Sequence, residues 1–342
     1  MTIEIKTTSV EPLRHTFDNV ARRLGADKPA SRYLEAMYDL QPTANFHYRP
    51  YWDPDHALYD TGRTRIEMTD WYVFKDPRQF YYGTWTMARA KQQDAAERNF
   101  AFVEKRNLAD TLESAWREKA ARLLVPLRHL EYAANMNNCY VAAYGYGTAI
   151  TQAAMFVGID RLGIAQYLSR IGLMLDGGSA ESLDAAKQDW MQAPVWQPLR
   201  RLAEDLMVTR DWFELLVAQD FVLDGILYPL VYDRFDRVLE QHSGSTISML
   251  TEFMNEWFTE TSRWVDMTLK TAAAESDANK AQLEQWMGHW VDRVAEALTP
   301  VAVEMLGSDA GAVMDELQTA LAQRATKKCG LHVGEPAPAM AS

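Results

Sequence analysis

Apolar residues recur every three or four positions from about residue 93 to residue 324, and this spacing predicts α-helices along most of the chain. Glycines and short polar turns interrupt the pattern and mark the expected helix ends. Pro126 predicts a break in one helix, and Pro229, inside an apolar stretch, predicts a bend. Beyond residue 148 the predicted helices are 149–174, 180–190, 196–208, 210–240, 244–273, 276–298 and 300–324. The pattern therefore predicts an all-α protein built as one bundle of long helices.

The stretch from Tyr132 to Ile159 has no charged residue and is long enough to cross a bilayer. It nevertheless contains several asparagines, threonines and glycines and few leucines, isoleucines or valines. No asymmetry of lysine and arginine in short loops supports membrane insertion. We therefore predict a helix buried inside a large bundle and no membrane association.

The N-terminal region has a different pattern. A short helix is expected from about Ala30, followed by QPTANFHYRPYWDPDHALYDTG (41–62), in which prolines and aromatic residues favour extended chain. Such an arm either lies on its own domain or wraps around another subunit. Asp76 and Pro77 read as the start of the next helix. The predicted regions are an arm with an aromatic, proline-rich docking segment (1–92), the helical bundle (93–326) and a disordered tail (327–342).

The composition of the chain argues against several classes of partner and location. The net charge of −12 and pI of about 5.1 argue against nucleic acid as a partner, because binding phosphates requires a basic face. Cys139 and Cys329 are too few for a disulfide framework, and the N-terminus shows no secretory signal. We therefore expect a cytoplasmic protein.

Carboxylates are the most informative polar residues. Glu131 and Asp160 flank the uncharged run, and Glu260 lies in a later helix. Helix bundles hold paired metal ions with Glu and Glu-x-x-His residues, but Gly163 and Arg263 stand at the third position after Asp160 and Glu260. Neither residue is a metal ligand, and none of the seven histidines lies in a Glu-x-x-His motif.

The acids must then have other partners. Glu260 and Arg263 are spaced to form an ion pair along one helix. Asp160 is expected to be buried or half-buried and to need a partner, for which the candidates are His129, Asn137, Asn138 or a nearby arginine. The sequence does not choose among them.

Four stretches carry a resemblance to a known family: FHYRPYWDPDHALYD (46–60), DWYVFKDPRQFYYGTWTMARA (70–90), LEYAANMNNCYVAAYGYG (130–147) and ETSRWVDMTLK (260–270). Through them the chain resembles the β subunit of the hydroxylase of bacterial multicomponent soluble diiron monooxygenases. It looks closest to the phenol hydroxylase type, with toluene/o-xylene monooxygenases as near relatives.

The resemblance implies an (αβγ)2 hydroxylase. The α subunit would carry a diiron centre on a ferritin-like four-helix core, and the β subunit would share the ferritin-like fold without the metal. Electrons would come from NADH through a separate reductase with FAD and a 2Fe–2S cluster, and a regulatory protein would act on the complex.

The resemblance also assigns positions. Glu131 corresponds to the first ligating glutamate of α, and the pairs Asp160/Gly163 and Glu260/Arg263 correspond to its two Glu-x-x-His motifs. The remaining carboxylate falls near Asp220 to Asp224. Both histidine positions are lost, so the expectation is that this chain has no catalytic, cofactor-binding or metal-binding residues.

Three functions remain in competition. The first is a non-catalytic structural subunit of an NADH-dependent aromatic monooxygenase. The second is an independent ferritin-like carboxylate-bridged diiron oxidase, and the third is a helical adaptor. Under the first, aromatic residues and one arginine near the N-terminus would contact the other subunits: Phe46, Tyr48, Tyr51, Trp52, Trp71, Arg78, Tyr81 and Tyr82.

Overall fold

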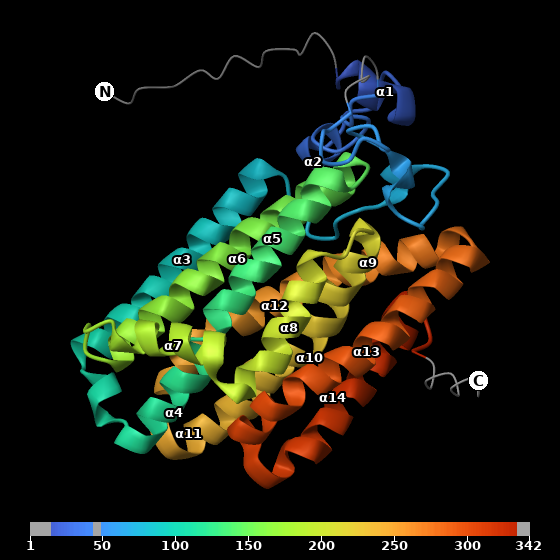
Figure 1. The fold of residues 1–342 in the computed structure, drawn as a ribbon. Helices are drawn as coiled ribbons and strands as arrows, with labels where there is room; N and C mark the ends of the chain where they lie inside the picture. Colours follow the sequence, from blue (N-terminus) through green and yellow to red (C-terminus); the bar gives the residue numbers. More distant parts are fainter. Residues whose placement is uncertain (1–14, 44–48, 334–342) are drawn as a thin grey trace, which may run out of the picture.

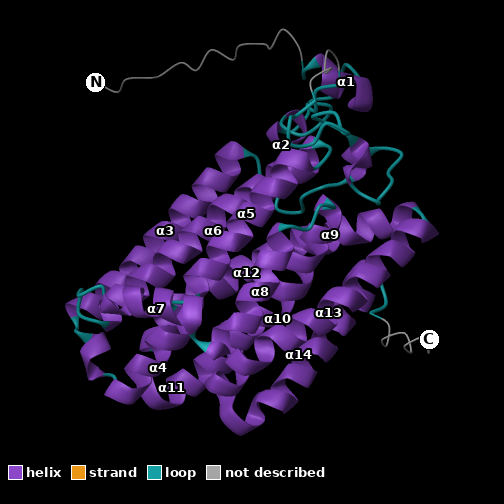
Figure 2. Cartoon of the chain, in the orientation of Figure 1, coloured by secondary structure: helices purple, strands orange, loops and turns teal. Residues whose placement is uncertain are grey.

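In the computed structural model the periodic segments fold into long α-helices, and no strand occurs among the described residues, 15–43 and 49–333 (Figures 1 and 2). The N-terminal part holds α1 (Asp18–Leu24) and α2 (Arg32–Glu35). The bundle begins with α3 (Tyr82–Lys105), α4 (Ser114–Leu124), α5 (Leu127–Tyr144), α6 (Thr148–Leu175), α7 (Glu181–Gln192) and α8 (Gln197–Met207). It continues with α9 (Trp212–Leu216), α10 (Asp224–Pro229), α11 (Asp236–Ser243), α12 (Thr246–Glu275), α13 (Asp277–Leu306) and α14 (Ala310–Arg324). The predicted all-α bundle is confirmed.

Helices α9, α10 and α11 form one continuous helix. Two π-helical segments, Val217–Leu223 and Leu230–Phe235, join them. The helix continues through Pro229, as predicted. Asp211 caps its N-terminus, because the Asp211 carboxylate accepts the N–H groups of Phe213 and Glu214 at 2.9 and 3.2 Å. The stretch Trp212–His242 is long and apolar enough to span a membrane, but 89% of its most apolar window is buried inside the bundle. Its composition is that of a core helix.

Four helices form the centre of the bundle: α5, α6, the continuous helix 212–243, and α12. Helices α5 and α6 pack against each other along their length after a short turn at Gly145–Gly147. The two helices are in contact at Gly158, where a Cβ would make ordinary van der Waals contacts, 3.5 Å from the Asn138 side chain and 3.6 Å from Cys139 Sγ. The other helices surround this centre, with α3 along one side and α13 and α14 along the other (Figure 1).

The N-terminal segment lies on its own bundle. The Arg65 N–H donates to Asp211 at 2.7 Å, and the Thr69 N–H donates to Glu275 at 2.8 Å. Trp71 is buried, with its ring 5.6 Å from that of Trp212. The described part of the arm, from Arg49 onwards, therefore contacts its own domain extensively. This is the first of the two alternatives predicted for the arm.

Two predicted helix ends are wrong. Asp76 and Pro77 lie in a turn, because the Asp76 carboxylate is engaged by Arg78, and α3 starts only at Tyr82. The predicted break at residue 299 is also absent, since α13 runs through Pro300 to Leu306. Gly307 ends this helix with a positive φ of 62°, which glycine adopts at low cost.

The C-terminal end is ordered further than predicted. Helical turns continue through Ala325–Cys329, and both Cys329 and Leu331 are buried. The His332 N–H donates to Glu284 on α13 at 2.9 Å. The tail predicted as disordered from residue 327 is thus packed as far as Val333, and the remainder lies outside the described residues.

Candidate functional site

The predicted acids come together in the middle of the four central helices, but they form two clusters instead of one. Glu131 of α5 lies with Asp220 and Asp224 of the continuous helix, and Asp160 of α6 lies with Glu260 of α12. Each cluster is organised around one arginine. Because Asp160 and its neighbour Arg161 point to different faces of α6, each contributes to a different cluster.

Arg161 is the centre of the first cluster. Its Nη1 donates to Glu131 Oε2 and to the Tyr228 hydroxyl, both at 3.1 Å, and its Nη2 donates to Asp220 Oδ1 at 3.2 Å and to Asp224 Oδ2. The Tyr228 hydroxyl in turn donates to Glu131 Oε1 at 2.9 Å. The charged side chains are only 1–2% exposed. Three acids from two helices therefore share one guanidinium in a site closed to solvent.

Burial controls the ionisation of this cluster. It raises the pKa of Glu131, of Asp224 and of Asp220, the last to about 7, against the opposing effect of the Arg161 charge. Burial alone would lower the pKa of Arg161, but the charges of Asp224, Tyr228, Glu131 and Asp220 raise it well above its usual value. The cluster thus keeps a permanent cation and favours protonation of its acids.

Arg89 of α3 is the centre of the second cluster. Its Nε and Nη2 donate to the two oxygens of Asp160, both at 2.7 Å, and Nη2 also donates to Glu260 Oε1 at 2.8 Å. The indole N–H groups of Trp85 and Trp257 each donate to Asp160 at 3.0 Å. The Asp160 carboxylate accepts four hydrogen bonds, which satisfies it without any metal ion.

Trp257 joins the two clusters. Its N–H group donates to Asp160, and the Arg161 guanidinium carbon lies 4.5 Å from its ring centroid. A cation over an indole ring at this distance is favourable, particularly away from water. The fully buried indole separates the acids that a dinuclear metal site would need side by side.

Gly163 and Arg263, which the resemblance places at histidine positions of α, lie outside both clusters. A Cβ added to Gly163 would meet nothing within 4 Å, and Arg263 is exposed. The predicted Glu260–Arg263 ion pair is wrong, because Glu260 pairs with Arg89 at 2.8 Å and with Arg78 at 3.7 Å. The partner of Asp160 is indeed an arginine.

The other proposed partners of Asp160 have different contacts. The Asn138 amide donates to Asp220 at 3.0 Å, and the Asn137 amide donates to Gln219 at 2.9 Å. The His129 ring stacks at 5.9 Å on Trp190, and burial lowers its pKa to about 4. His129 is therefore neutral near pH 7, but it is not part of either cluster.

These clusters do not fit a pair of iron ions. In the described part of the chain no group of three or more His, Cys, Asp or Glu side chains is arranged to hold a metal ion. The guanidinium of Arg161 is always cationic and has no lone pair to donate. It would therefore repel a metal ion placed among Glu131, Asp220 and Asp224. The clusters can hold the central helices together, but their donors do not suit oxygen activation at metal ions.

Arg161, Arg89 and Trp257 were not predicted from the sequence as members of the site. The available signal was the position of Arg161, which directly follows Asp160 at the end of the uncharged run, inside a largely apolar helix. A charged residue in such a helix is rarely fully buried unless it is paired. Arg89 gave no comparable signal, because it lies in a polar helix among other charged residues.

The predicted interface residues differ in their exposure. Tyr51, Trp52 and Tyr82 are 95%, 65% and 73% exposed, although the Trp52 N–H donates to the Tyr144 hydroxyl at 2.8 Å. Tyr81 is half-buried. Trp71 is buried and the Arg78 side chain is 3% exposed, so the chain itself covers both. Phe46 and Tyr48 lie outside the described residues.

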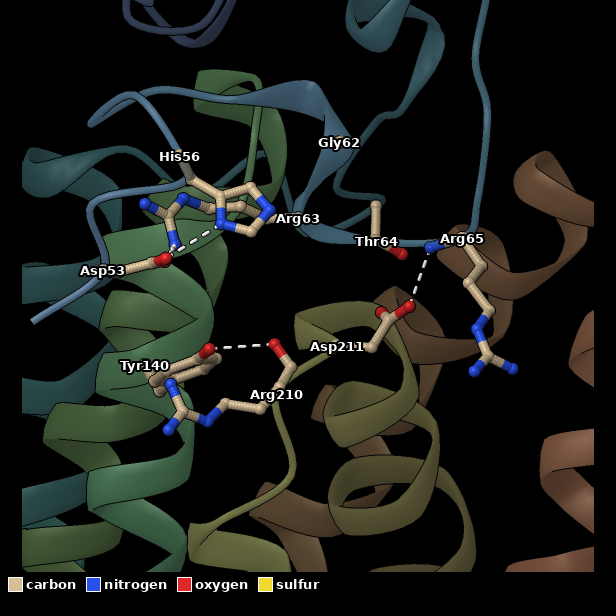
Figure 3. A pocket seen from close by; sticks show the side chains of 9 residues that line it. All are labelled: Asp53, His56, Gly62, Arg63, Thr64, Arg65, Tyr140, Arg210 and Asp211. Atoms are coloured by element: carbon tan, nitrogen blue, oxygen red, sulfur yellow. Dashed lines mark hydrogen bonds and ion pairs between the residues drawn. The ribbon is translucent and has the colours of Figure 1, made fainter. Parts of the chain in front are cut away.

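A polar pocket of about 350 Å³ lies where the arm meets the bundle (Figure 3). On the arm side, Asp53 pairs with Arg63 and with His56, the latter at 2.9 Å. On the bundle side, the Tyr140 hydroxyl donates to the Arg210 carbonyl at 2.8 Å. Of the contacts drawn, the one from the Arg65 N–H to Asp211 joins the arm to the start of α9. The pocket reads as an anchor for the arm.

Comparison with known proteins shows the family of the chain. Residues 52–276 match the family model described as Methane/Phenol/Alkene Hydroxylase. The chain is 52% identical over 327 residues to the phenol 2-monooxygenase oxygenase component DmpL of Pseudomonas sp. (strain CF600), covering 96% of this chain and 98% of that protein.

Two further matches are informative. The toluene-4-monooxygenase hydroxylase component subunit beta of Ectopseudomonas mendocina is 24% identical over 303 residues, 86% of each chain. The crystal structure of xenon-pressurized phenol hydroxylase from Pseudomonas sp. OX1 contains a chain that is 48% identical, with a TM-score of 0.90 over 96% of this chain and 99% of that chain.

Proposed function

This chain belongs to the methane/phenol/alkene hydroxylase family, and from that membership we propose that it is the non-catalytic structural β subunit of a phenol-type multicomponent monooxygenase hydroxylase. Its similarity to proteins named as an oxygenase component and as a hydroxylase subunit beta supports this role. As such it takes part in an aromatic monooxygenase without an active site of its own.

The observation that carries the proposal is the contact of Arg161 with three buried acids. In an iron-binding bundle these acids would face metal ions. Here a guanidinium neutralises part of their charge and forms ion pairs with Glu131, Asp220 and Asp224. The same observation disfavours an independent diiron oxidase, because such an enzyme would need a cation site where Arg161 lies. Under this proposal the role of the chain is to hold the other subunits of the hydroxylase in place.

The partners follow from the subunit role. A diiron α subunit and a small γ subunit would complete an (αβγ)2 hydroxylase in the cytoplasm. A reductase with FAD and a 2Fe–2S cluster would supply electrons from NADH, and a regulatory protein would act on the complex. The iron would perform the oxygen chemistry in the α subunit, and this chain would support the helices around it.

The N-terminal region is the proposed docking segment, and the helices from residue 93 form the scaffold. Within that segment, Tyr51, Trp52 and Tyr82 offer exposed aromatic surface, which is favoured at protein interfaces. Deleting residues 1–60 should abolish assembly while leaving a mostly helical chain. Because that deletion removes many contacts, the matched test is Tyr51→Ala, which changes only an exposed side chain. If both variants assemble as the wild type does, the docking role is refuted.

Co-expression tests the proposal as a whole. The chain should be produced with the product of a neighbouring gene that carries two Glu-x-x-His motifs, and the complex should be weighed by native mass spectrometry. The proposal expects a heteromeric complex containing both chains in equal numbers. A stable monomer that does not bind such a chain would contradict it.

A further inference from the structure

The cluster around Arg161 contains buried polar atoms that the rest of the described chain leaves without a hydrogen-bond partner. They are Asp220 Oδ2, Asn138 Oδ1, Arg161 Nε and the Tyr232 hydroxyl. Each of these residues is at most 3% exposed. An unpaired polar atom shielded from water costs free energy, and in a native protein it calls for an explanation. Two of these atoms belong to side chains that are already bonded, because the Asn138 amide donates to Asp220 Oδ1 at 3.0 Å.

The cluster also holds more acids than cations. One permanent cation, Arg161, faces three buried acids: Glu131, Asp220 and Asp224. If all three acids were ionised, this site would hold two uncompensated negative charges. An acid in such surroundings binds a proton instead of staying charged. At least one of the three is therefore expected to be protonated in the folded chain.

The helices packed around these acids supply little further charge. The titratable and charged groups around Asp220 and Asp224 come from α5, α6, α14 and their own helix: Glu131, Arg161, Arg324, Tyr228 and Tyr232. Burial raises the pKa of both tyrosines well above its usual value, so they stay neutral. Helices α12 and α13 pack on the segment that carries Asp220, and all their buried residues are uncharged. Burial raises the pKa of Asp224, but the charges of Arg161 and Arg324 oppose that rise and favour its ionised form.

Two of the three acids have both carboxylate oxygens occupied by donors. Glu131 accepts from the Tyr228 hydroxyl at 2.9 Å and from Arg161 at 3.1 Å, one on each oxygen. Asp224 accepts from the Gln219 amide at 3.2 Å on one oxygen and from Arg161 on the other. A proton on any of these oxygens would point towards a donor. Neither acid is therefore a good place for it.

Asp220 is different. Its Oδ1 accepts from Asn138 and Arg161, but its Oδ2 meets no donor among the described residues. The orientation of the Asn138 amide is fixed, because its NH2 group also donates to the Ala134 carbonyl at 3.1 Å. A flipped amide would place its oxygen against that carbonyl. Asn138 Oδ1 is thus an acceptor without a donor, beside an acid that has room for a proton.

We propose that Asp220 takes up one proton on folding, holds it on Oδ2 and donates it to Asn138 Oδ1, so that the carboxyl and the amide form a ring of two hydrogen bonds. The ring pairs two of the unpartnered atoms. The proton also removes one of the two excess negative charges in the cluster. Because it concerns the fold of the chain itself, the inference goes beyond the proposed function and does not depend on the partner subunits.

The acid–amide ring makes the core sensitive to alkaline pH. Burial and the charge of Asp224 raise the pKa of Asp220, which reaches about 7. Above that pH, two ionised carboxylates would lie four residues apart on one buried helix, where like charges repel. Asn138 belongs to α5, so the ring joins α5 to the continuous helix while the proton is bound. We expect this contact to weaken as the pH rises through about 7.

A water molecule is a poorer occupant of the same place. It could donate to both Asp220 Oδ2 and Asn138 Oδ1, but it would leave Asp220 ionised. The cluster would then keep two excess negative charges in a site closed to solvent. Water and proton differ in whether Asp220 carries a charge at pH 6, and this difference can be measured.

Infrared spectroscopy of the full-length chain detects the proton directly. A protonated carboxyl group has a C=O stretching band that an ionised one lacks, and the band shifts in D2O. Asp220→Asn reproduces the shape of the protonated acid, because its NH2 group can donate to Asn138 Oδ1. We expect the difference between the wild-type and variant spectra to contain the band of one carboxyl group at pH 6. The band should be lost at pH 9.

Two matched variants complete the test. Asp233→Asn changes an acid of the same continuous helix that pairs with Arg237 at 2.7 Å and is 39% exposed, and its difference spectrum should lack the band at pH 6. Asp224→Asn would turn an NH2 group towards a donor, so its Tm at pH 6 should fall below that of the wild type. The Tm of Asp220→Asn should equal or exceed the wild-type value.

Two results would overturn the proposal. If the wild type and Asp220→Asn have the same carboxyl bands at pH 6, Asp220 is ionised and a water occupies the place, or another acid holds the proton. If Asp220→Asn fails to fold or melts below the wild type at pH 6, the amide does not reproduce the state of Asp220. In that case the acid is charged in the folded chain, and the acid–amide ring does not exist.

Discussion

Replacing Arg161 by methionine would remove the cation from the most deeply buried charge cluster of the chain. Methionine has a similar length and can fill the apolar part of the space, but it offers no donor to the three acids. Glu131, Asp220 and Asp224 would each lose an ion pair, at side-chain exposures of 1–2%. The variant therefore isolates the electrostatic contribution of the guanidinium.

The expected cost is large. Removing one partner of a buried ion pair destabilises a protein by about 3–5 kcal/mol, because the remaining charge is left uncompensated. With three acids left behind, we expect the free energy of unfolding to fall by at least roughly 5 kcal/mol near pH 8. The cost should be smaller near pH 5. Without the guanidinium the pKa values of the folded acids rise further, so they are neutral at low pH and their desolvation costs less.

Arg170→Met is the matched control. It lies on the same helix and forms an ion pair with Glu97 at 2.8 Å, but its side chain is 33% exposed. Surface pairs of this kind contribute about 0–1 kcal/mol. Urea unfolding of each purified full-length chain, followed by circular dichroism at pH 5 and pH 8, gives the comparison. If Arg161→Met costs no more than Arg170→Met at pH 8, the account of the cluster is refuted.

Three further predictions concern single groups. The pKa of Asp220 is about 7 in the folded chain against an ordinary value of 3.8, so its contribution to stability is complete below pH 4 and is lost as the pH rises through 7. The free energy of unfolding of Asp220→Asn, measured in urea, should therefore gain roughly 4 kcal/mol relative to that of the wild type between pH 4 and pH 8. A difference between the two proteins that does not change with pH would contradict this. Asp160→Asn should cost about 2–3 kcal/mol in the same assay, since its four donors include a guanidinium; a loss below 0.5 kcal/mol would show that the cluster is not structural. Burial raises the pKa of the Cys329 thiol to about 12, so it should react with a thiol reagent only after unfolding; rapid reaction of the native chain would show that the packed C-terminal turns are wrong.

The sequence predicted the helices well where periodicity was long and the ends had clear markers. The break at Pro126 agrees with the structure, and the helix predicted over 210–240 corresponds to the continuous helix 212–243. The expected break at residue 299 does not, because a proline inside a well-packed helix costs stability without always ending it. Helix α13 ends at Gly307, and a glycine is a common marker of a helix end. The apolar spacing continues across this position, so the end was not predicted there.

The sequence indicated which acids lie in the centre of the bundle, but it did not indicate that they form two separate clusters. Spacing along a helix indicates which face a residue occupies, and so Glu131, Asp160 and Glu260 could be placed in the bundle. Which basic residue meets each acid depends on packing between helices distant in the chain, and Arg89 lies 71 residues from Asp160. Local spacing therefore favoured the nearby Arg263 as the partner of Glu260, and tertiary contacts selected Arg89.

The environment of Gly163 in the structure differs from the one expected from the sequence. Its spacing from Asp160 suggested a lost histidine position, and no metal-ligand geometry surrounds it in the described part of the chain. The residue opens towards solvent beside Ile159, so its environment is decided by what covers the outer face of α6. One chain alone could not indicate that from sequence.

Iron stoichiometry tests the central claim most directly. The full-length chain should be purified alone after expression with added iron, and also in complex with its neighbouring diiron chain, and the iron should be measured per mole of each polypeptide. The account predicts less than about 0.1 iron per mole of this chain alone, and two irons per sister chain in the complex. Two irons bound to this chain alone, and lost from Glu131→Ala, would contradict it.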